Sequence, residues 1–428
     1  MQKNGIRITT KPKIIRTFTN EKQQLMYSLR ELYKIGKGPS SSHTMGPYRA
    51  AQIFAARHPE AARFEVTLYG SLASTGKGHM TDAAIVQALG PTAPVTICWE
   101  PGIIPEYHPN GMLFKSLGLD DVPTEEWTVY SIGGGALSEG KDKEMSLSGE
   151  VYKMNSLTEI IDWCDTNGRQ LWEYVDLCEG PGIWDYLQEI WEAMKASVER
   201  GLTAEGRLPG PLNLSRKAAV YQVKAQGYMP NLRSRGLVFA YALAVSEENA
   251  SGGMIVTAPT CGSSGVMPGV LYHLSKGHGF TDTRILHALA TAGLIGNVVK
   301  HNASISGAEV GCQGEVGVAC AMASAAACQL FGGSPYQIEY AAEMGLEHHL
   351  GMTCDPVCGL VQIPCIERNA FAACRALDSN IYSTFSDGRH RISFDHVVDV
   401  MKRTGKDLPS LYRETSAGGL AFNYKQKQ

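Results

Sequence analysis

The sequence lacks several features that would assign it to a class at once. No apolar run approaches the roughly 20 residues that a membrane-spanning helix needs. The basic stretch 1–16 contains no apolar core of the kind that a secretory signal carries. With a net charge of −3, nothing favours binding to nucleic acid or to an acidic membrane surface. We therefore expect a cytoplasmic protein with neither nucleic acid nor membrane as a partner.

Several enzyme motifs are missing as well. The Gly- and Ser-rich loop 70–82 lacks the G-x-x-x-x-G-K-[ST] spacing of a phosphate-binding P-loop. No lysine stands in a recognisable pyridoxal-binding motif, and the surroundings of Lys224 and Lys300 do not support such a role. Neither repeats nor low-complexity segments interrupt the chain. These absences disfavour nucleotide hydrolysis and pyridoxal chemistry.

The length and composition indicate a globular protein of more than one domain. With 428 residues the chain is long enough for two or three domains, and 44% hydrophobic with 19% charged residues is an ordinary globular balance. Strand and helix signals mix in residues 1–170, whereas strand signals nearly vanish from residue 183 onward. We expect an α+β fold, with an α+β domain at 1–170, a linkage near the Gly- and Pro-containing stretch 178–182, and an all-α domain at 183–428.

Hydrophobic periodicity predicts the individual elements. In the first part we expect helices at 21–34 and 48–58 and one ending at Leu89, strands at 64–69, 95–99, 127–132 and 150–154, and a polar turn at 108–112. The stretch 158–201 is helical in pattern. Further helices are expected at 184–199, 234–246, 283–297, 315–331, 337–349 and 366–377, and their Ala- and Gly-rich sequences predict close packing.

Cysteine usage points to a metal or catalytic site in the second part. Eight of the 11 cysteines lie at or beyond Cys261, which in a large chain favours a reducing compartment over a disulfide framework. Cys312, Cys354 and Cys365 stand among Gly, Pro, Thr and Asp, with 41 and 10 residues between them. Three thiolates suit a metal with one open position, such as zinc or a four-iron cluster. The alternative is that they are buried, reduced thiols without a ligand.

The loop 35–47 is a second candidate site. It places the run Ser40, Ser41, Ser42, His43 and Thr44 immediately before a predicted helix. Hydroxyl side chains and free backbone N–H groups at a helix start suit a carboxylate or a phosphate. The alternative is a Ser-rich connector that only caps the helix.

Both candidate sites resemble one known family. The words S-I-S-G-A-E-V-G-C-Q-G-E-V-G-V-A-C at 304–320, T-C-D-P-V at 353–357 and V-Q-I-P-C-I-E-R-N-A at 361–370 are similar to the catalytic domain of the iron–sulfur-dependent L-serine dehydratases of bacteria. The words G-P-S-S-S-H-T-M-G-P at 38–47, G-K-G-H at 76–79, H-P-N-G-M at 108–112 and S-I-G-G-G at 131–135 resemble the N-terminal β domain of the same family. The resemblance covers almost the whole chain.

The resemblance implies a reaction and a set of residues for it. It implies that Cys312, Cys354 and Cys365 hold a [4Fe-4S] cluster whose open iron acts as a Lewis acid while L-serine loses water. A base that titrates near neutrality is also needed, and His43 is the predicted one. Ser40, Ser41, Ser42 and Thr44 are predicted to bind the substrate carboxylate, and His79, His108, Asn110 and Gly111 to line the same cleft between the domains. We also expect a homodimer.

The remaining candidates are assigned lesser roles. Cys320, Cys328 and Cys374 lie in small-residue helices and are expected to be core residues, as is Cys261, where many relatives have Asn. Cys358 is a reserve ligand at most, and His348 and His349 are either neighbours of the cluster or residues satisfied at a helix end. Some relatives end in a cysteine that caps the open iron, but residues 422–428 contain none.

Two alternative functions stay open from the sequence. A related lyase acting on L-threonine or L-cysteine would use the same cluster, because discrimination among side chains depends on the shape of the pocket. A metal-bearing regulator that senses an amino acid through the loops of the first part would bind a ligand without turnover.

Overall fold

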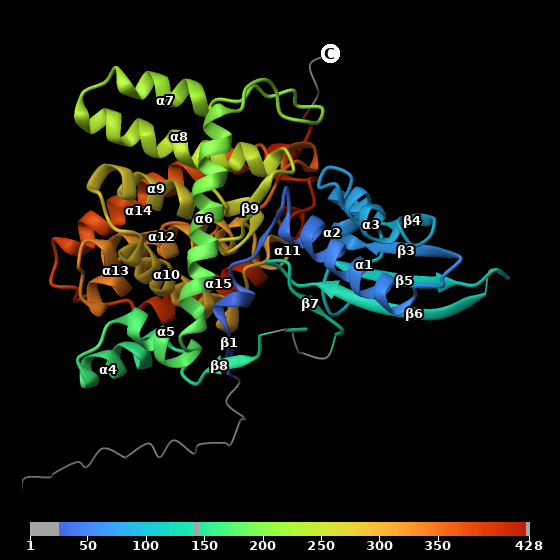
Figure 1. The fold of residues 1–428 in the computed structure, drawn as a ribbon, viewed down its shortest axis with the longest axis horizontal. Helices are drawn as coiled ribbons and strands as arrows, with labels where there is room; N and C mark the ends of the chain where they lie inside the picture. Colours follow the sequence, from blue (N-terminus) through green and yellow to red (C-terminus); the bar gives the residue numbers. More distant parts are fainter. Residues whose placement is uncertain (1–24, 121, 141–144, 147, 425–428) are drawn as a thin grey trace, which may run out of the picture.

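The chain folds into an α/β lobe beside a larger helical body (Figure 1). This computed structural model describes residues 25–120, 122–140, 145–146 and 148–424. The arrangement confirms the expected fold class, a mixed α/β region followed by a mostly helical one. The predicted site residues of both parts lie where the lobe meets the body.

A five-stranded sheet forms the lobe, in the order β4-β3-β5-β6-β7. The strands are β3 (Arg63–Tyr69), β4 (Val95–Glu100), β5 (Gly111–Leu117), β6 (Pro123–Ser131) and β7 (Leu137–Ser138). β3 runs parallel to β4, and the other pairs are antiparallel. Alternate side chains of β3 are buried, as expected for a sheet with one covered face.

Helices cover that buried face of the sheet. They are α1 (Gly46–Arg57) and α3 (Thr81–Leu89), while the short α2 (Gly70–Thr75) follows β3 directly. Phe54 of α1 packs against Phe64, Phe114 and Trp127 of three strands, with ring centroids 5.5 to 6.1 Å apart. The lobe therefore has a hydrophobic core of its own.

Long helices build the body around a central pair, α10 and α12. Its helices are α4 (Leu157–Asn167), α5 (Leu171–Glu179), α6 (Gly182–Thr203), α7 (Ala218–Gln226), α8 (Pro230–Ala250), α9 (Val266–His278), α10 (Asp282–Asn302), α11 (Gly307–Val310), α12 (Val316–Leu330), α13 (Pro335–Glu347), α14 (Cys365–Thr384) and α15 (Phe394–Asp407). Nearly all of α12 is buried, and its Ala, Gly and Ser residues allow the close packing that the sequence predicts.

Most predicted elements are confirmed, with small shifts at their ends. The four predicted strands correspond to β3, β4, β6 and β8 (Glu150–Tyr152), and the six helices of the second part to α6, α8, α10, α12, α13 and α14. The predicted turn at 108–112 is shorter than expected because β5 begins at Gly111. The helices α7, α9 and α15 were not predicted.

The helix expected at 21–34 is wrong over its described part, and residues 21–24 lie outside the described residues. The segment forms β1 (Met26–Tyr27), a 3-10 turn at Leu29–Glu31, and β2 (Ile35–Lys37). Local hydrogen bonds hold only the turn, and other polar groups bond to distant partners: the amide of Leu29 donates to Glu179 at 2.6 Å, and Asn297 donates to the carbonyl of Tyr27 at 2.6 Å. Its apolar residues are spaced as in a helix, but they pack into the hydrophobic core of the body.

Two contacts connect the lobe to the body. β2 pairs antiparallel with β9 (Met254–Val256), which lies more than 200 residues further along the chain. The turn Gly133, Gly134 and Gly135 has positive φ at each residue and lies against Ile305 and Ser306 of the body, where a Cβ on Gly133 would come within 3.2 Å of the Ser306 Cβ. The glycine run thus permits a close interdomain contact.

The hydrophobic core of the body extends beyond the helices after residue 183. It includes Met26, Leu29 and Tyr33 from the N-terminal segment, and Leu157 and Leu171 from α4 and α5. The domain division between residues 170 and 183 stays a prediction.

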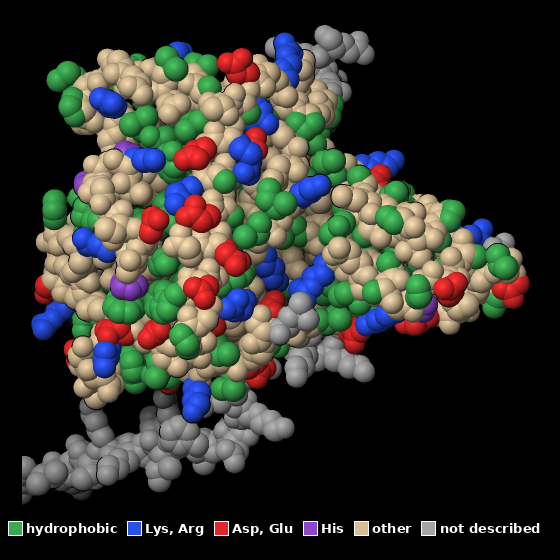
Figure 2. All heavy atoms as spheres, in the orientation of Figure 1, with side chains coloured by type: hydrophobic (Ala, Val, Ile, Leu, Met, Phe, Trp, Pro, Cys, Tyr) green, Lys and Arg blue, Asp and Glu red, His purple; other side chains and the backbone are tan. Residues whose placement is uncertain are grey.

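Charged side chains of both signs share the face of the molecule that Figure 2 shows. Figure 2 shows Lys and Arg side chains interspersed with Asp and Glu over the visible face. Within the described ranges, the chain has no helix long and apolar enough to cross a membrane.

Candidate active site

The loop with the predicted base is folded as one tight helical turn, Ser41–Met45. Ser40, Ser41, Ser42, His43 and Thr44 are all buried. The Ser40 hydroxyl accepts a hydrogen bond from the amide of His43 at 3.1 Å. The Thr44 hydroxyl donates to the carbonyl of His79 at 2.7 Å. Two of the predicted carboxylate donors are thus engaged in shaping the loop and joining it to the G-K-G-H loop.

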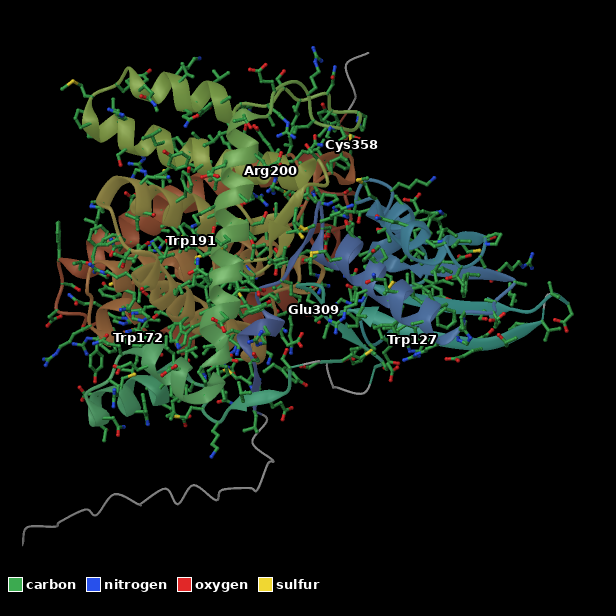
Figure 3. The ribbon with its side chains drawn as sticks, viewed as in Figure 1. Trp127, Trp172, Trp191, Arg200, Glu309 and Cys358 are labelled. Atoms are coloured by element: carbon green, nitrogen blue, oxygen red, sulfur yellow. The ribbon has the colours of Figure 1, made fainter. Side chains whose placement is uncertain are left out.

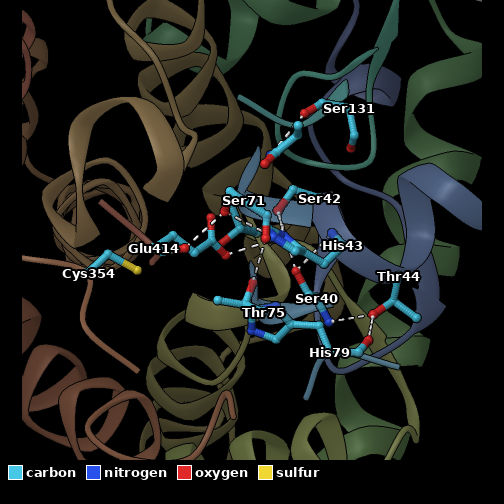
Figure 4. A network of polar contacts seen from close by, with 12 residues as sticks. Ser40, Ser42, His43, Thr44, Ser71, Thr75, His79, Ser131, Cys354 and Glu414 are labelled. Carbon is cyan, nitrogen blue, oxygen red and sulfur yellow. Dashed lines mark hydrogen bonds and ion pairs between the residues drawn. The ribbon is translucent and has the colours of Figure 1, made fainter. Parts of the chain in front are cut away.

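His43 lies at the centre of this network (Figure 4), and its hydrogen bonds indicate its tautomer. The Ser71 hydroxyl donates to the carbonyl of Glu414 at 2.9 Å, so it accepts from His43 Nε2 at 3.2 Å. Nδ1 therefore carries the free electron pair, and Ser42 donates to it at 2.9 Å. Burial, together with the neighbouring His79, lowers the pKa of His43 well below its usual value. The imidazole is a neutral base at neutral pH.

Further buried polar atoms around His43 have no hydrogen-bond partner among the described residues. The rings of His79 and His43 are 4.5 Å apart, and Nδ1 of His79 is unpaired. His108 accepts from the amide of Asn110 at 3.1 Å, which leaves His108 Nε2 and Asn110 Oδ1 unpaired. Gly111 is buried at the start of β5. Because buried polar atoms are nearly always bonded, these atoms are available to water or to a polar ligand, and His108 Nε2 lies 3.8 Å from Glu309 Oε1.

A residue from the end of the chain completes this group. Glu414 is buried, and its Oε1 lies 3.5 Å from Nδ1 of His43. His43, His79 and Glu414 have ligand atoms within 4.8 Å of one another. Burial and the nearby Glu315 raise the pKa of the Glu414 carboxyl.

The three predicted cluster ligands surround the neighbouring space. Cys312 and Cys354 are buried in the body, and Cys365 begins α14. Burial raises the pKa of each thiol, that of Cys312 to about 11, and the charges of Cys312 and Cys365 act on Cys354. Cysteines separated by 41 and 10 residues in the sequence therefore lie close enough in the fold for their charges to act on one another.

The donor set fits a cationic iron–sulfur group. Glu315 lies beside the thiols, with its Oε2 4.0 Å from the Cys354 sulfur, and burial raises its pKa to about 7. Arg368, held by the carbonyl of Thr353 at 2.7 Å, is a cation that acts on Cys312, Cys365 and Glu315. Three thiolates and two carboxylates in this space would need more positive charge than Arg368 alone supplies. Soft thiolate ligands are those that iron–sulfur clusters use.

A glycine keeps the space between these groups open. A Cβ on Gly307, at the start of α11, would lie 2.7 Å from Glu315 Oε2 and 3.3 Å from the Cys354 sulfur. Any side chain at this position would enter the space that the thiols face.

Of the other cysteines, Cys261 lies near Glu315 of this group, and its pKa is raised by burial and by that carboxyl. Cys320, Cys328 and Cys374 are buried in α12 and α14, as predicted for core residues, and Cys261 is buried as well. Cys358 is exposed, in a turn at the upper edge of the junction between lobe and body (Figure 3), and stays unsupported as a ligand.

The two histidines before Cys354 are satisfied at the end of α13. Nδ1 of His348 and Nδ1 of His349 lie 2.9 and 2.7 Å from the carbonyl oxygens of Met344 and Gly345. Their hydrogen bonding matches the helix-end interpretation.

A cleft between the lobe and the body leads to the site. It has a volume of about 480 Å³ and includes Ser71 and Pro109 from the lobe and Glu309, Lys402 and Arg413 from the body. Glu309 lies at this junction in Figure 3. Two cations near the opening suit an entering carboxylate.

Sequence reasoning missed four polar residues of the site. They are Ser71, Glu315, Arg368 and Glu414. Glu315 and Arg368 stand inside words that carry the family resemblance, so those words contained their signal, whereas Ser71 and Glu414 lie outside the quoted words. Their roles depend on contacts between segments up to 343 residues apart, which no local pattern reveals.

Comparisons with known proteins agree with this geometry. The family described as "Serine dehydratase beta chain" matches residues 28–100, and "Serine dehydratase alpha chain" matches residues 136–421. The chain is 39% identical to "L-serine dehydratase 1" of Escherichia coli K12 over 93% of its own length and 99% of the relative. It is 40% identical to "L-serine dehydratase" of Streptomyces coelicolor over 92% and 98%, and 34% identical to that of Helicobacter pylori over 93% and 99%. The chain therefore belongs to the serine dehydratase family and carries its beta-chain and alpha-chain parts in one polypeptide.

Proposed function

We propose that this chain is an L-serine ammonia-lyase that converts L-serine to pyruvate and ammonia with a [4Fe-4S] cluster bound by Cys312, Cys354 and Cys365. The observation that carries the proposal is that Glu414 links a neutral histidine to the thiols: its Oε1 lies 3.5 Å from Nδ1 of His43, and its charge acts on Cys354 and Cys365. The relatives named L-serine dehydratase, which match over nearly their full length, support the substrate.

The reaction needs a base and help for a poor leaving group. L-Serine loses its α-proton and its hydroxyl as water, which gives 2-aminoacrylate; this tautomerises to an imine, and water hydrolyses the imine to pyruvate and ammonia. A cluster with three protein ligands supplies a Lewis acid for the departing hydroxyl.

His43 is the proposed base. Its Nδ1 holds the basic lone pair of the neutral ring, which accepts a hydrogen bond from Ser42, and the bond from Nε2 to Ser71 fixes the plane of the ring. Ser71 in turn donates to the backbone of Glu414, so the orientation of the ring depends on contact between lobe and body. General base catalysis by a positioned imidazole contributes about 10²- to 10⁴-fold to a rate.

We retain the residues predicted to bind the substrate, but their contacts divide them into residues that face His43 and residues that support the loop. Ser42 faces His43, whereas Ser40 and Thr44 support the loop; Ser41 is buried in the same turn. The unpaired atoms of His79, His108 and Asn110 are proposed to meet the substrate, with Gly111 lining the site. A homodimer in the cytoplasm stays a prediction.

The proposal is tested by a substrate comparison under anaerobic conditions. Cluster-loaded protein is expected to form pyruvate from L-serine with a kcat/KM well above its value for L-threonine or L-cysteine. A higher kcat/KM for L-threonine or L-cysteine would assign the lyase another substrate. Binding of L-serine without any turnover would favour a sensor.

A further inference from the structure

L-Serine presents a third polar group that the predicted site leaves without a partner. Its carboxylate and hydroxyl have proposed partners, but its α-ammonium carries a full positive charge. The residues predicted from the sequence to bind substrate are hydroxyls, imidazoles, an amide and a glycine. A buried ammonium requires a charged or strongly accepting partner, because an unpaired charge in a buried site is costly.

Glu414 offers such a partner within the site. Its side chain is buried, Oε1 lies 3.5 Å from His43 Nδ1, and Oε2 has no hydrogen-bond partner in the described part of the chain. A carboxylate oxygen that is buried and unbonded is rare in a folded protein. Oε2 is therefore available to a cationic ligand, and a cation there would counter the burial and the Glu315 charge that raise the pKa of this carboxyl.

The backbone fixes Glu414 firmly in place. Its amide donates to the carbonyl of Cys354 at 2.8 Å, and its carbonyl accepts from Ser71 at 2.9 Å. Its φ is +58°, in the left-handed region that residues other than glycine seldom adopt. Such strain persists where the surroundings over-determine the conformation, and it concentrates at functional sites.

The neighbouring carboxyl is less suited to the role. Oε1 of Glu315 accepts a hydrogen bond from Thr260 at 2.8 Å, and its Oε2 lies toward the Cys354 sulfur. Glu315 is thus held toward the thiols, whereas Glu414 stands between the thiols and His43.

We propose that Glu414 binds the α-ammonium of L-serine and so places the α-proton at His43. The inference rests on the proposed function and names a substrate-binding residue for it. The ammonium and the α-proton are attached to the same carbon, so their partners must be neighbours, as Glu414 Oε1 and His43 Nδ1 are. The carboxylate also distinguishes an amino acid from the corresponding hydroxy acid.

The test separates binding from turnover by removing the base. L-Serine and L-glycerate, in which a hydroxyl replaces the ammonium, are titrated calorimetrically into anaerobic, cluster-loaded His43→Ala protein and into the His43→Ala/Glu414→Gln double variant. Glu414→Gln is expected to raise the Kd for L-serine by about 30-fold or more, because it neutralises one partner of a buried charge pair. The Kd for L-glycerate is expected to change less than about threefold, because this ligand has no ammonium and loses no charge pair.

Two further variants serve as controls. Glu414→Asp keeps the charge and is expected to recover part of the affinity for L-serine, with the iron content of the parent. Glu205→Gln makes the same chemical change at an exposed carboxylate and is expected to leave both Kd values unchanged.

Three results would overturn the inference. One is equal loss of L-serine and L-glycerate, which would mean that Glu414 only supports the fold. Another is an unchanged Kd for L-serine in the double variant. The third is a divalent metal outside the cluster that disappears with Glu414→Gln, which would make His43, His79 and Glu414 a cation site. Failure of the proposed function shows itself separately, as wild-type, cluster-loaded protein that forms no pyruvate from L-serine.

Discussion

The amide of Glu414 lies 2.8 Å from the carbonyl oxygen of Cys354, and the amide of Cys354 lies 2.8 Å from the carbonyl of Tyr412. The last part of the described chain thus pairs, strand-like, with the loop of a proposed cluster ligand. Because Ser71 of the lobe also bonds to Glu414, three distant segments hold one another at this point. The site exists only when the chain is folded from end to end.

Replacing a proposed cluster ligand should remove the cluster. Cys312→Ser, Cys354→Ser and Cys365→Ser are each expected to lose most of the iron, because serine is a poor ligand where soft thiolates are needed. Cys320→Ser is the matched control: Cys320 is also fully buried, but in the core of α12. Iron and sulfide analysis of anaerobic protein measures the outcome, and full iron in any of the first three variants would refute the ligand assignment.

Removing the proposed base should affect turnover and spare the cluster. His43→Ala is expected to lower kcat by about 10²- to 10⁴-fold, the usual contribution of a positioned base. Its iron content should equal that of the wild type, since His43 bonds to Ser42 and Ser71 and belongs to the lobe. Near-normal kcat in this variant would place the base elsewhere.

Filling the space beside the thiols should hinder cluster binding. Gly307→Ala adds a Cβ 2.7 Å from Glu315 Oε2, whose side chain is held by Thr260, so we expect lower iron content and a destabilisation of about 1–3 kcal/mol. The control Gly277→Ala adds a methyl group to open space on α9 and should stabilise the protein by up to about 1 kcal/mol. Wild-type iron loading and stability in Gly307→Ala would contradict a cluster at this place.

Shortening the chain should separate the roles of the tail. A chain ending at Ala421 keeps Glu414 and the bond from the Leu420 amide to Asp355 at 2.7 Å. Because residues 422–428 contain no cysteine to cap an iron, this chain is expected to lose activity in air at the wild-type rate. Marked acceleration would show that the tail protects the site in another way. A chain ending at Arg413 is expected to be inactive.

The stability of the protein should fall at mildly acidic pH because of buried neutral histidines. Burial lowers the pKa of His273, in α9, to about 4 from its usual 6.5. As the pH falls below 6.5, His273 becomes protonated in the unfolded chain but stays neutral in the folded chain, so unfolding becomes more favourable. For His273 alone this amounts to about 2 kcal/mol at pH 5. The difference in unfolding free energy between pH 7 and pH 5, measured in urea, should be smaller by about that amount in His273→Asn.

Sequence reasoning predicted the cysteines and His43 because their motif words are local. The words around Cys312, Cys354 and Cys365 are contiguous, and the structure brings the three thiols near one another, while their role as cluster ligands stays a prediction. The long helices α10, α12 and α14 were equally accessible: α14 buries residues at a helical spacing, whereas α10 and α12 are Ala- and Gly-containing runs with continuous buried stretches.

The misses share a physical cause, which is dependence on distant partners. The segment before Lys34 has helical spacing, yet Glu179 and Asn297 bond to two of its backbone groups, and β1 pairs with β8. Directly after the segment, β2 pairs with β9. Ser71 and Glu414 are ordinary residues in sequence, and only their mutual contact places them at His43. Local sequence patterns reflect a residue's neighbours along the chain and do not show its tertiary contacts.

The most direct test of the account is iron and sulfide analysis of anaerobically purified protein together with pyruvate formation from L-serine, repeated after exposure to air. The account predicts about four irons per chain, turnover of L-serine, and loss of both in air. Stable pyruvate formation by protein free of iron would contradict it.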